Sequence, residues 1–271
     1  MKPLSGKVAI VTGGARGIGL GYAERLASLG ANIAVCDLNL KSAEQYPLEA
    51  GRLVEGSLEK TLRKHDTDVL LAEFNAADPE ANKAFAAAVH ARWGRIDVVV
   101  CNAGGGSDTE GSNASELKPD AVRNTFERNF YSTVYTCTAV APYMKAQHSG
   151  KIINIASLAA IMALGNGRAA DYAASKAAVA HYTRVLAQDL APHGVTANAI
   201  APGFIASGQW QTRFGKNDQE VLDGWAKQVP LGRLGTPEDC ANVVQFLSTS
   251  LSDYVTGQVI SVDGGICRGP N

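Results

Sequence analysis

Short apolar runs recur along the chain, and longer segments whose apolar positions have helical spacing lie between most of them. The short runs are nearly continuous and rich in β-branched residues, as in strands that are covered on both faces. The runs that predict strands are Lys7–Thr12, Asn32–Asp37, Asp68–Phe74, Ile96–Cys101, Lys151–Ala156, Val195–Ala201 and Gln258–Val262. The longer segments predict helices, most clearly Pro79–Trp93 and Ala169–Leu190.

This alternation of strands and helices indicates an α/β fold. We expect a Rossmann-type, doubly wound parallel sheet of about seven strands with helices on both faces. No linker, internal repeat or low-complexity tract interrupts the pattern. Residues 1–271 are therefore expected to form a single domain that both binds a dinucleotide and carries the catalytic groups.

Two stretches do not fit the alternation. Residues 40–67 are charged and longer than a simple strand-to-helix connection requires, which predicts a helical insertion on the surface. Residues 203–230 follow a strand end and are rich in Gly, Gln and Trp, so we expect them to form a mobile lid over the substrate. We call these two segments the insertion and the lid.

Composition and charge narrow the classes of protein. The net charge of -1 gives no electrostatic reason to expect nucleic acid or an acidic membrane surface as a partner. No apolar run reaches the roughly 18 residues that span a bilayer, and the N-terminus has no signal-peptide pattern. The chain has five scattered cysteines and no CxxC, which argues against disulfides and a metal site. We therefore expect a cytoplasmic protein with reduced thiols.

A glycine-rich turn, TGGARGIG, follows the first strand and opens a helix. Glycines allow a diphosphate to approach the backbone closely, and the helix N-terminus offers free N–H groups and a positive dipole to the anion. Gly13, Gly17, Ile18 and Gly19 are therefore expected to hold the diphosphate of a dinucleotide. A purely structural turn is the alternative, and the flanking strand and helix favour the cofactor.

The end of the second strand bears on the choice of cofactor. Asp37 lies about 20 residues past the glycines, where a carboxylate accepts hydrogen bonds from ribose hydroxyls and repels a 2′-phosphate. Arg16, within the glycine-rich turn, could instead pair with a 2′-phosphate. Asp37 is expected to lie closer to the ribose, so we favour NAD over NADP.

Tyr172 and Lys176 stand four residues apart in a helical run, which places both on one face. The pKa of a free tyrosine is near ~10, too high for a base at neutral pH. A neighbouring ammonium lowers that pKa and makes general acid–base catalysis by Tyr172 feasible. The pair alone could equally be an exposed polar face.

Further signatures decide between these readings because they occur in a fixed order along the chain. They are TGGARGIG, CNAG at 101–104, Asn129, Ser157, YAASK at 172–176, APG at 201–203 and YVTGQVISVDGG at 254–265. From about Gly6 to Gly265 the chain resembles the one-domain short-chain dehydrogenase/reductase family, whose members are commonly tetrameric.

The resemblance implies a catalytic role for each of four residues. Tyr172 would exchange a proton with the substrate oxygen, and Ser157 would hydrogen-bond that oxygen. Lys176 would hold the nicotinamide ribose and lower the pKa of Tyr172. Asn129 would hold a water that links Lys176 to solvent. The structural alternatives are a strand-end cap for Ser157 and a helix hydrogen bond for Asn129.

The resemblance also implies further contacts to the cofactor, beyond those of Arg16, Asp37, Tyr172 and Lys176. Asn102, Ala103 and Gly104 would line the ribose and adenine side, and Pro202, Gly203 and Ile205 would frame the nicotinamide. Ser207 keeps a hydroxyl where the family usually has threonine, and Asn75 replaces a frequent aspartate as an acceptor for the adenine amino group.

The substrate pocket is expected at the carboxyl edge of the sheet. Its walls would be Gly105–Asn113, Leu158–Asp171 and Phe204–Lys227. These segments contain Ser107, Asp108, Asn166, Arg168, Trp210 and Arg213, which favours a small polar substrate. Arg168 could pair with a substrate carboxylate, although a solvated loop arginine is the commoner situation.

These observations predict an oxidoreductase that transfers a hydride between NAD(H) and a small secondary alcohol or ketone. One alternative is an NADPH-dependent 3-oxoacyl-carrier-protein reductase, against which stand Asp37 and the acidic residues Asp108 and Glu110 near the mouth. A non-catalytic cofactor-binding protein usually has a broken catalytic set. A nucleotide-sugar epimerase or dehydratase usually has a larger C-terminal domain. The helical stretches Val122–Met144 and Ala173–Leu190 are apolar enough to pack against copies of the chain.

Overall fold

A single parallel sheet forms the centre of the molecule in the computed structural model, which describes residues 2–107, 113–163, 167–215 and 218–267. Its strand order is β3-β2-β1-β4-β5-β6-β7. The strands are β1 (Val8–Thr12), β2 (Asn32–Asp37), β3 (Val69–Glu73), β4 (Val98–Cys101), β5 (Gly150–Ile155), β6 (Val195–Pro202) and β7 (Val259–Val262). This confirms the predicted fold class and strands, whose ends differ from the sequence-based limits by at most two residues.

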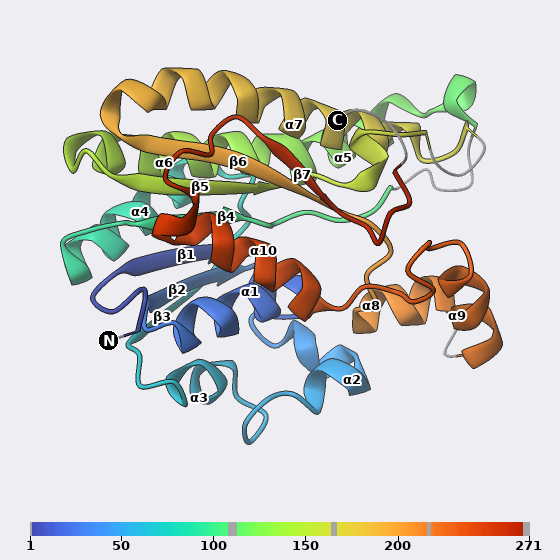
Figure 1. The fold of residues 1–271 in the computed structure, drawn as a ribbon, viewed down its shortest axis with the longest axis horizontal. Coiled ribbons are helices and arrows are strands. Elements are labelled where there is room, and N and C mark those ends of the chain that lie inside the picture. Colours follow the sequence, from blue (N-terminus) through green and yellow to red (C-terminus); the bar gives the residue numbers. More distant parts are fainter. Residues whose placement is uncertain (1, 108–112, 164–166, 216–217, 268–271) are drawn as a thin grey trace.

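Helices cover both faces of the sheet (Figure 1). One face carries α4 (Pro79–Trp93), α5 (Pro119–Phe126), α6 (Ser132–Ala146) and α7 (Ala170–Leu190), and the other carries α1 (Gly17–Ser28) and α10 (Pro237–Ser248). Side chains of β1 alternate between the two layers, as the pleat of a strand requires. Ala9 and Val11 join the apolar cluster on the side of α1 and α10, whereas Val8 and Ile10 join the cluster on the side of α4, α6 and α7.

The insertion is helical, as predicted, and contains η1 (Ser42–Gln45), α2 (Pro47–Ala50) and α3 (Leu58–Arg63). It is more than a surface addition, because Leu58 and Leu62 of α3 are buried in the apolar cluster that lies against α1. The charged composition of the segment concealed these two core positions.

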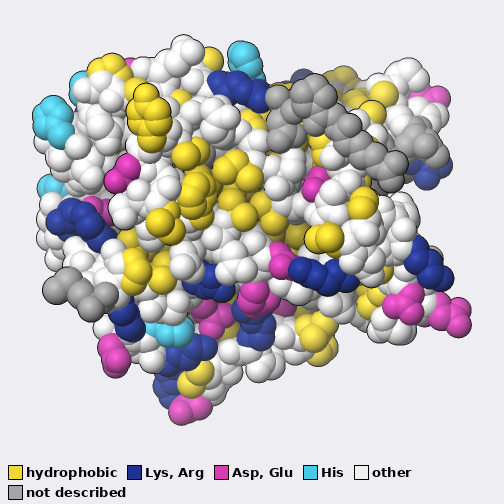
Figure 2. Space-filling model, viewed as in Figure 1, with side chains coloured by type: hydrophobic (Ala, Val, Ile, Leu, Met, Phe, Trp, Pro, Cys, Tyr) yellow, Lys and Arg dark blue, Asp and Glu magenta, His cyan; other side chains and the backbone are white. Residues whose placement is uncertain are grey.

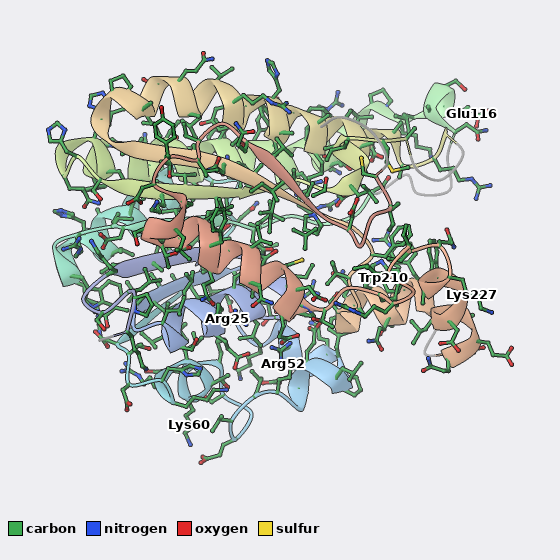
Figure 3. The ribbon with its side chains drawn as sticks, in the orientation of Figure 1. Arg25, Arg52, Lys60, Glu116, Trp210 and Lys227 are labelled. Atoms are coloured by element: carbon green, nitrogen blue, oxygen red, sulfur yellow. The ribbon has the colours of Figure 1, made fainter. Side chains whose placement is uncertain are left out.

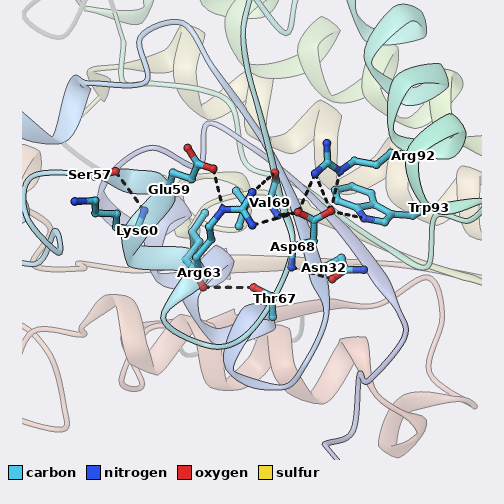
Figure 4. Close-up of polar contacts among 11 residues, drawn as sticks. Asn32, Ser57, Glu59, Lys60, Arg63, Thr67, Asp68, Val69, Arg92 and Trp93 are labelled. Carbon is cyan, nitrogen blue, oxygen red and sulfur yellow. Dashed lines mark hydrogen bonds and ion pairs between the residues drawn. The ribbon is translucent and has the colours of Figure 1, made fainter.

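Asp68, just before β3, joins the end of the insertion to α4 (Figure 4). Its carboxylate accepts hydrogen bonds from Arg92 Nε and Nη2, both at 2.8 Å, and from Trp93 Nε1 at 3.1 Å. Arg63 of α3 donates to the same carboxylate at 3.3 Å. Asp68 thus links α3, the last helix of the insertion, to the end of α4.

Within the described ranges, no helix is both long and apolar enough to cross a membrane. All five cysteines are free thiols, in agreement with the expectation of reduced cysteines.

Candidate active site

The glycine-rich turn forms a cradle at the carboxyl end of β1. Gly13 and Gly17 adopt φ values of 61° and 56°, which favour glycine over residues with a Cβ. A Cβ on Gly13 would lie 2.9 Å from Ala103 Cα, so the turn passes directly against the loop after β4. Asn102 fixes this approach by donating from Nδ2 to the carbonyl of Gly13 at 2.8 Å. The backbone at the start of α1 is therefore open to a diphosphate, and these residues fit a dinucleotide.

Asp37 lies at the end of β2, next to this cradle. Its Oδ2 accepts from the backbone N–H of Ala15 at 3.1 Å, which orients the carboxylate toward the turn. Asn75 follows β3, the neighbouring strand, and its Oδ1 accepts from the backbone N–H of Ala77 at 2.9 Å. The structure therefore brings Asp37 to the cradle, while the side chain of Asn75 forms a local turn.

Arg16 contacts the lid and the insertion. Its Nη1 donates to Gln209 Oε1 of the lid at 3.0 Å, and its guanidinium lies 5.1 Å from the centre of the Tyr46 ring in the insertion. The sequence suggested a 2′-phosphate as its partner, and the structure pairs it with protein groups instead.

The four predicted catalytic residues come from three different elements. Ser157 follows β5, Tyr172 and Lys176 lie on α7, and Asn129 lies in η3 (Glu127–Tyr131), a π-helical turn between α5 and α6. Asn129 is fully buried and pairs with the backbone of Gly105, accepting from its N–H at 2.9 Å and donating to its carbonyl at 3.1 Å. π-Helical turns are frequent at functional sites because they redirect one side chain.

Gly104 joins the cofactor side of the site to the catalytic side. A Cβ at this position would lie 2.6 Å from Asn129 Oδ1 and 3.2 Å from Lys176 Nζ. Only glycine leaves space for both polar groups beside the backbone. The loop after β4 therefore lies against Asn129 and Lys176.

Lys176 is buried and donates from Nζ to the carbonyl of Ile155, the last residue of β5, at 2.9 Å. Burial, and to a smaller extent the positive charge of Arg128, lower the pKa of its ammonium to about 8. Both effects disfavour the charged form of a lysine.

The pKa of Tyr172 differs from the sequence-based expectation. Burial raises the pKa of the phenol, while a hydrogen bond with Ser157 and the charge of Arg213 act in the opposite direction. The expected lowering by Lys176 was therefore wrong for this structure, in which the ammonium is bonded to Ile155 and desolvation dominates. Ser157 also caps a short turn, because its Oγ accepts from the backbone N–H of Ala159 at 3.2 Å. The same hydroxyl therefore has the capping role that was the structural alternative and also contacts Tyr172.

The lid begins directly after β6. Pro202 ends that strand, Gly203 donates its N–H to Val262 at 3.0 Å, and Ile205 is buried against Gly235. Because the Ile205 side chain is packed in the core, only its backbone remains for a cofactor. Ser207 lies close to the glycine-rich turn, 3.7 Å from where a Cβ of Gly17 would be.

Four aromatic side chains pack together in the described part of the lid, which contains α8 (Gly208–Trp210), η7 (Gln211–Gly215) and α9 (Gln219–Ala226). Phe204, Trp210, Phe214 and Trp225 form one cluster with ring centres 4.9 to 6.3 Å apart. Trp210 stands at the start of the lid in Figure 3. This part of the expected substrate wall thus contains an aromatic cluster beside its polar residues.

Two residues at the site had no signal in the sequence pattern. Asp171 is buried beside Tyr172 and accepts from Ser107 Oγ at 2.5 Å and Thr125 Oγ1 at 2.8 Å. Arg128 donates to the carbonyl of Gly106 at 2.7 Å. Each directly precedes a predicted catalytic residue, Tyr172 or Asn129, in the chain. This position was the only feature of the sequence that could have pointed to a role at the site.

The other predicted wall residues are placed as follows. Arg213 donates to the carbonyl of Ser107 at 3.2 Å. Arg168 is exposed and its backbone bridges to Asn113. Asp108, Glu110 and Asn166 lie outside the described residues.

A glycine cradle followed by a Ser–Tyr–Lys–Asn set, of which only the tyrosine is partly exposed, lies at the carboxyl edge of the parallel sheet and is typical of a nicotinamide-dependent oxidoreductase. A family model described as Enoyl-(Acyl carrier protein) reductase matches residues 13–267. The chain belongs to the short-chain dehydrogenase/reductase family, whose members bind a nicotinamide cofactor. The resemblance noted in the sequence is therefore confirmed.

Relatives with assigned activities cover nearly the whole chain. The cyclohexanol dehydrogenase of Rhodococcus sp. (strain TK6) is 46% identical, with 97% of each chain aligned. The 3-oxoacyl-[acyl-carrier-protein] reductase FabG of Chlamydia muridarum is 37% identical over 97% of this chain and 98% of its own. Among solved structures, levodione reductase superposes with a TM-score of 0.85 at 26% identity, covering 97% of this chain and 98% of the other.

Proposed function

We propose that the protein transfers a hydride between NAD(H) and a small secondary alcohol or ketone, with alicyclic alcohols as the preferred class. The main support for this reaction is that Gly104, in the loop after β4, lies against Asn129 and Lys176. The hydrogen bond between Ser157 and Tyr172 completes the catalytic set. The aromatic cluster of the lid and the cyclohexanol dehydrogenase relative favour an apolar ring over the polar substrate that the sequence suggested.

The residues of this chain have separate tasks in the proposal. Ser157 hydrogen-bonds the substrate oxygen, and Tyr172 accepts its proton during oxidation or returns it during reduction. Lys176 holds the nicotinamide ribose, and Asn129 positions Gly105 and a water between Lys176 and solvent. When bound, the nicotinamide ring accepts or supplies the hydride.

Asp37 supports NAD as the cofactor, because its carboxylate would repel a 2′-phosphate near the ribose. Asn102, Ala103 and Gly104 line the ribose side, while Pro202, Gly203, Ile205 and Ser207 frame the nicotinamide. The five free thiols are consistent with a cytoplasmic location, which is part of the proposal.

The second candidate function is an NADPH-dependent 3-oxoacyl-carrier-protein reductase. The FabG relatives and the description of the family model favour it. Asp37 favours the first candidate, and the pairing of Arg16 with Gln209 and Tyr46 supports the same choice. A non-catalytic cofactor-binding role has no comparable support, since all four catalytic residue types are present.

Steady-state assays separate these functions. Cyclohexanol, a linear secondary alcohol, a polyol and a hydroxy acid are each oxidised with NAD or NADP, and an acetoacetyl thioester is reduced with NADH or NADPH. We expect the highest kcat/KM for cyclohexanol with NAD. Tyr172→Phe should lower turnover by about 10²–10⁴-fold because the proton carrier is lost, while NADH binding is retained. A higher kcat/KM for the thioester with NADPH would establish the second candidate instead.

A further inference from the structure

The insertion contacts the first turn of the lid through a buried carboxylate. Glu49 of α2 is 3% exposed, and its Oε1 accepts from the backbone N–H of Gly208 at 2.8 Å. The two residues are 159 positions apart in the chain. Figure 1 shows α2 and α8 next to each other at one end of the sheet, in agreement with their contacts.

Arg16 provides a second connection at the same place. Its guanidinium donates to Gln209 Oε1 at 3.0 Å and lies 5.1 Å from the centre of the Tyr46 ring, within the range of a cation–π contact. The glycine-rich turn, the insertion and the lid are therefore joined through one side chain.

These contacts lie directly beside the diphosphate cradle. A Cβ on Gly17 would be 3.4 Å from Glu49 Oε1 and 3.7 Å from Ser207 Cβ. Gly17 belongs to the turn that approaches the diphosphate, so Glu49 and the start of the lid border the space where the cofactor binds.

The insertion is itself held firmly to the helices of the sheet. Arg52 donates to Glu24 of α1 at 3.0 Å and to Glu238 of α10 at 2.9 Å, and Lys64 donates to Glu24 at 2.7 Å. Figure 3 shows Arg52 beside α2, on the side of the insertion that lies below α1. The insertion can therefore act as a fixed support to which the lid attaches.

We propose that Glu49, with Arg16, Tyr46 and Gln209, forms a latch that holds the first turn of the lid closed over the cofactor diphosphate. The lid must leave Glu49 and Arg16 before the cofactor can dissociate, so the latch sets the rate of cofactor release. Glu49 and Gln209 are positioning residues in this account, because they act on the lid and contact no reacting atom.

The latch also changes the role of Arg16. A 2′-phosphate could recruit its guanidinium only after Gln209 and Tyr46 had released it. Replacing Asp37 alone therefore leaves Arg16 engaged by the lid, and binding of NADP gains little from that change.

Release of NADH from the whole protein tests the latch without any alcohol. Bound NADH is displaced by excess NAD, and the loss of its fluorescence is followed by stopped flow. Loss of a hydrogen bond to a charged group should raise the release rate of NADH, by about tenfold in Glu49→Ala and by about threefold in Gln209→Ala. Glu49→Gln keeps an acceptor oxygen and should restore a rate close to that of the wild type.

Leu48→Ala is the matched control, because Leu48 is exposed on the same short helix and belongs to none of these contacts. Release rates within twofold of the wild type in both Glu49→Ala and Gln209→Ala would overturn the latch, as would equal acceleration by Leu48→Ala. If Glu49→Ala does not fold, Gln209→Ala and Glu49→Gln decide the matter. The same release measurements with NADPH distinguish a wrong cofactor assignment from a failed latch. Because no alcohol is present in the assay, the result does not depend on which substrate the protein uses.

Discussion

Lys176 combines burial with a positive charge, two properties that oppose each other. Its pKa is lowered to about 8 from an ordinary value of 10.5, chiefly by burial. The ammonium therefore lowers the stability of the folded protein at neutral pH, although the proposed reaction needs a positive group beside the ribose. Function and stability conflict at this residue.

Lys176→Met should accordingly raise the stability of the cofactor-free protein at pH 7. A pKa lowered to about 8 corresponds to roughly 3 kcal/mol. Loss of the bond to Ile155 O offsets part of this, which leaves a gain of about 1–2 kcal/mol. Between pH 8 and pH 10.5 the unfolded lysine binds more protons than the folded one, so wild-type stability should rise relative to the variant. Urea unfolding of both proteins across this range measures the difference, and a less stable variant at pH 7 would contradict the argument.

Among the elements, the π-helical turn η3 and the loop after β4 depend on each other. Asn129 satisfies both the N–H and the carbonyl of Gly105, and Gly104 passes against Asn129 and Lys176. A single amide thus fixes the backbone that borders the cofactor and catalytic sides of the site.

Asn129→Ala should leave two backbone groups of Gly105 without their partner. Each lost partner costs about 1–3 kcal/mol where water cannot replace it, so the midpoint of thermal unfolding should fall. Turnover should fall as well, and the KM for the cofactor should rise because the loop lines its ribose. Thermal unfolding and steady-state kinetics measure these effects. Asn124→Ala, at an exposed position of α5, is the control. Unchanged stability would show that Gly105 does not depend on Asn129.

The elements differ in how far the sequence predicts them. The limits of α4 were predicted without error because its signals are local: Asp78 caps its first turn, Pro79 begins it, and Gly94 ends it with φ of 71°. Tyr172 and Lys176 were recognised because one helix carries both. The bonds of Asp171 and Glu49 were not predictable, since they join segments 46 to 159 residues apart that share no pattern.

At the scale of the whole molecule, β7 forms one edge of the sheet, and a groove of about 790 Å³ runs between it and α7. Polar residues such as Arg184, Gln188 and Thr256 line this groove together with apolar ones such as Val259 and Ile260. Figure 2 shows hydrophobic side chains gathered across the middle of this face. On α7, Val185 is 54% exposed, on a helix whose sequence predicted packing against other copies.

A homotetramer, expected from the family resemblance, would cover such surfaces. Light scattering coupled to gel filtration should then give about four times the chain mass of 28.4 kDa. Val185→Glu places a charge on the exposed face of α7 and should reduce the measured mass, whereas Lys227→Glu on the exposed end of the lid should not. A wild-type mass equal to one chain would contradict the expectation.

The position of β7 has a consequence for synthesis of the chain. Of the seven strands in the described sheet, β7 is synthesised last, and it pairs with β6, whose residues from Ala197 to Pro202 are all buried. Until residues 259–262 emerge, β6 presents an unpaired edge of apolar residues, the kind of surface from which nascent chains aggregate. Fragments that end before Val259 should therefore require chaperones to stay dispersed, because the edge of β6 stays uncovered in them.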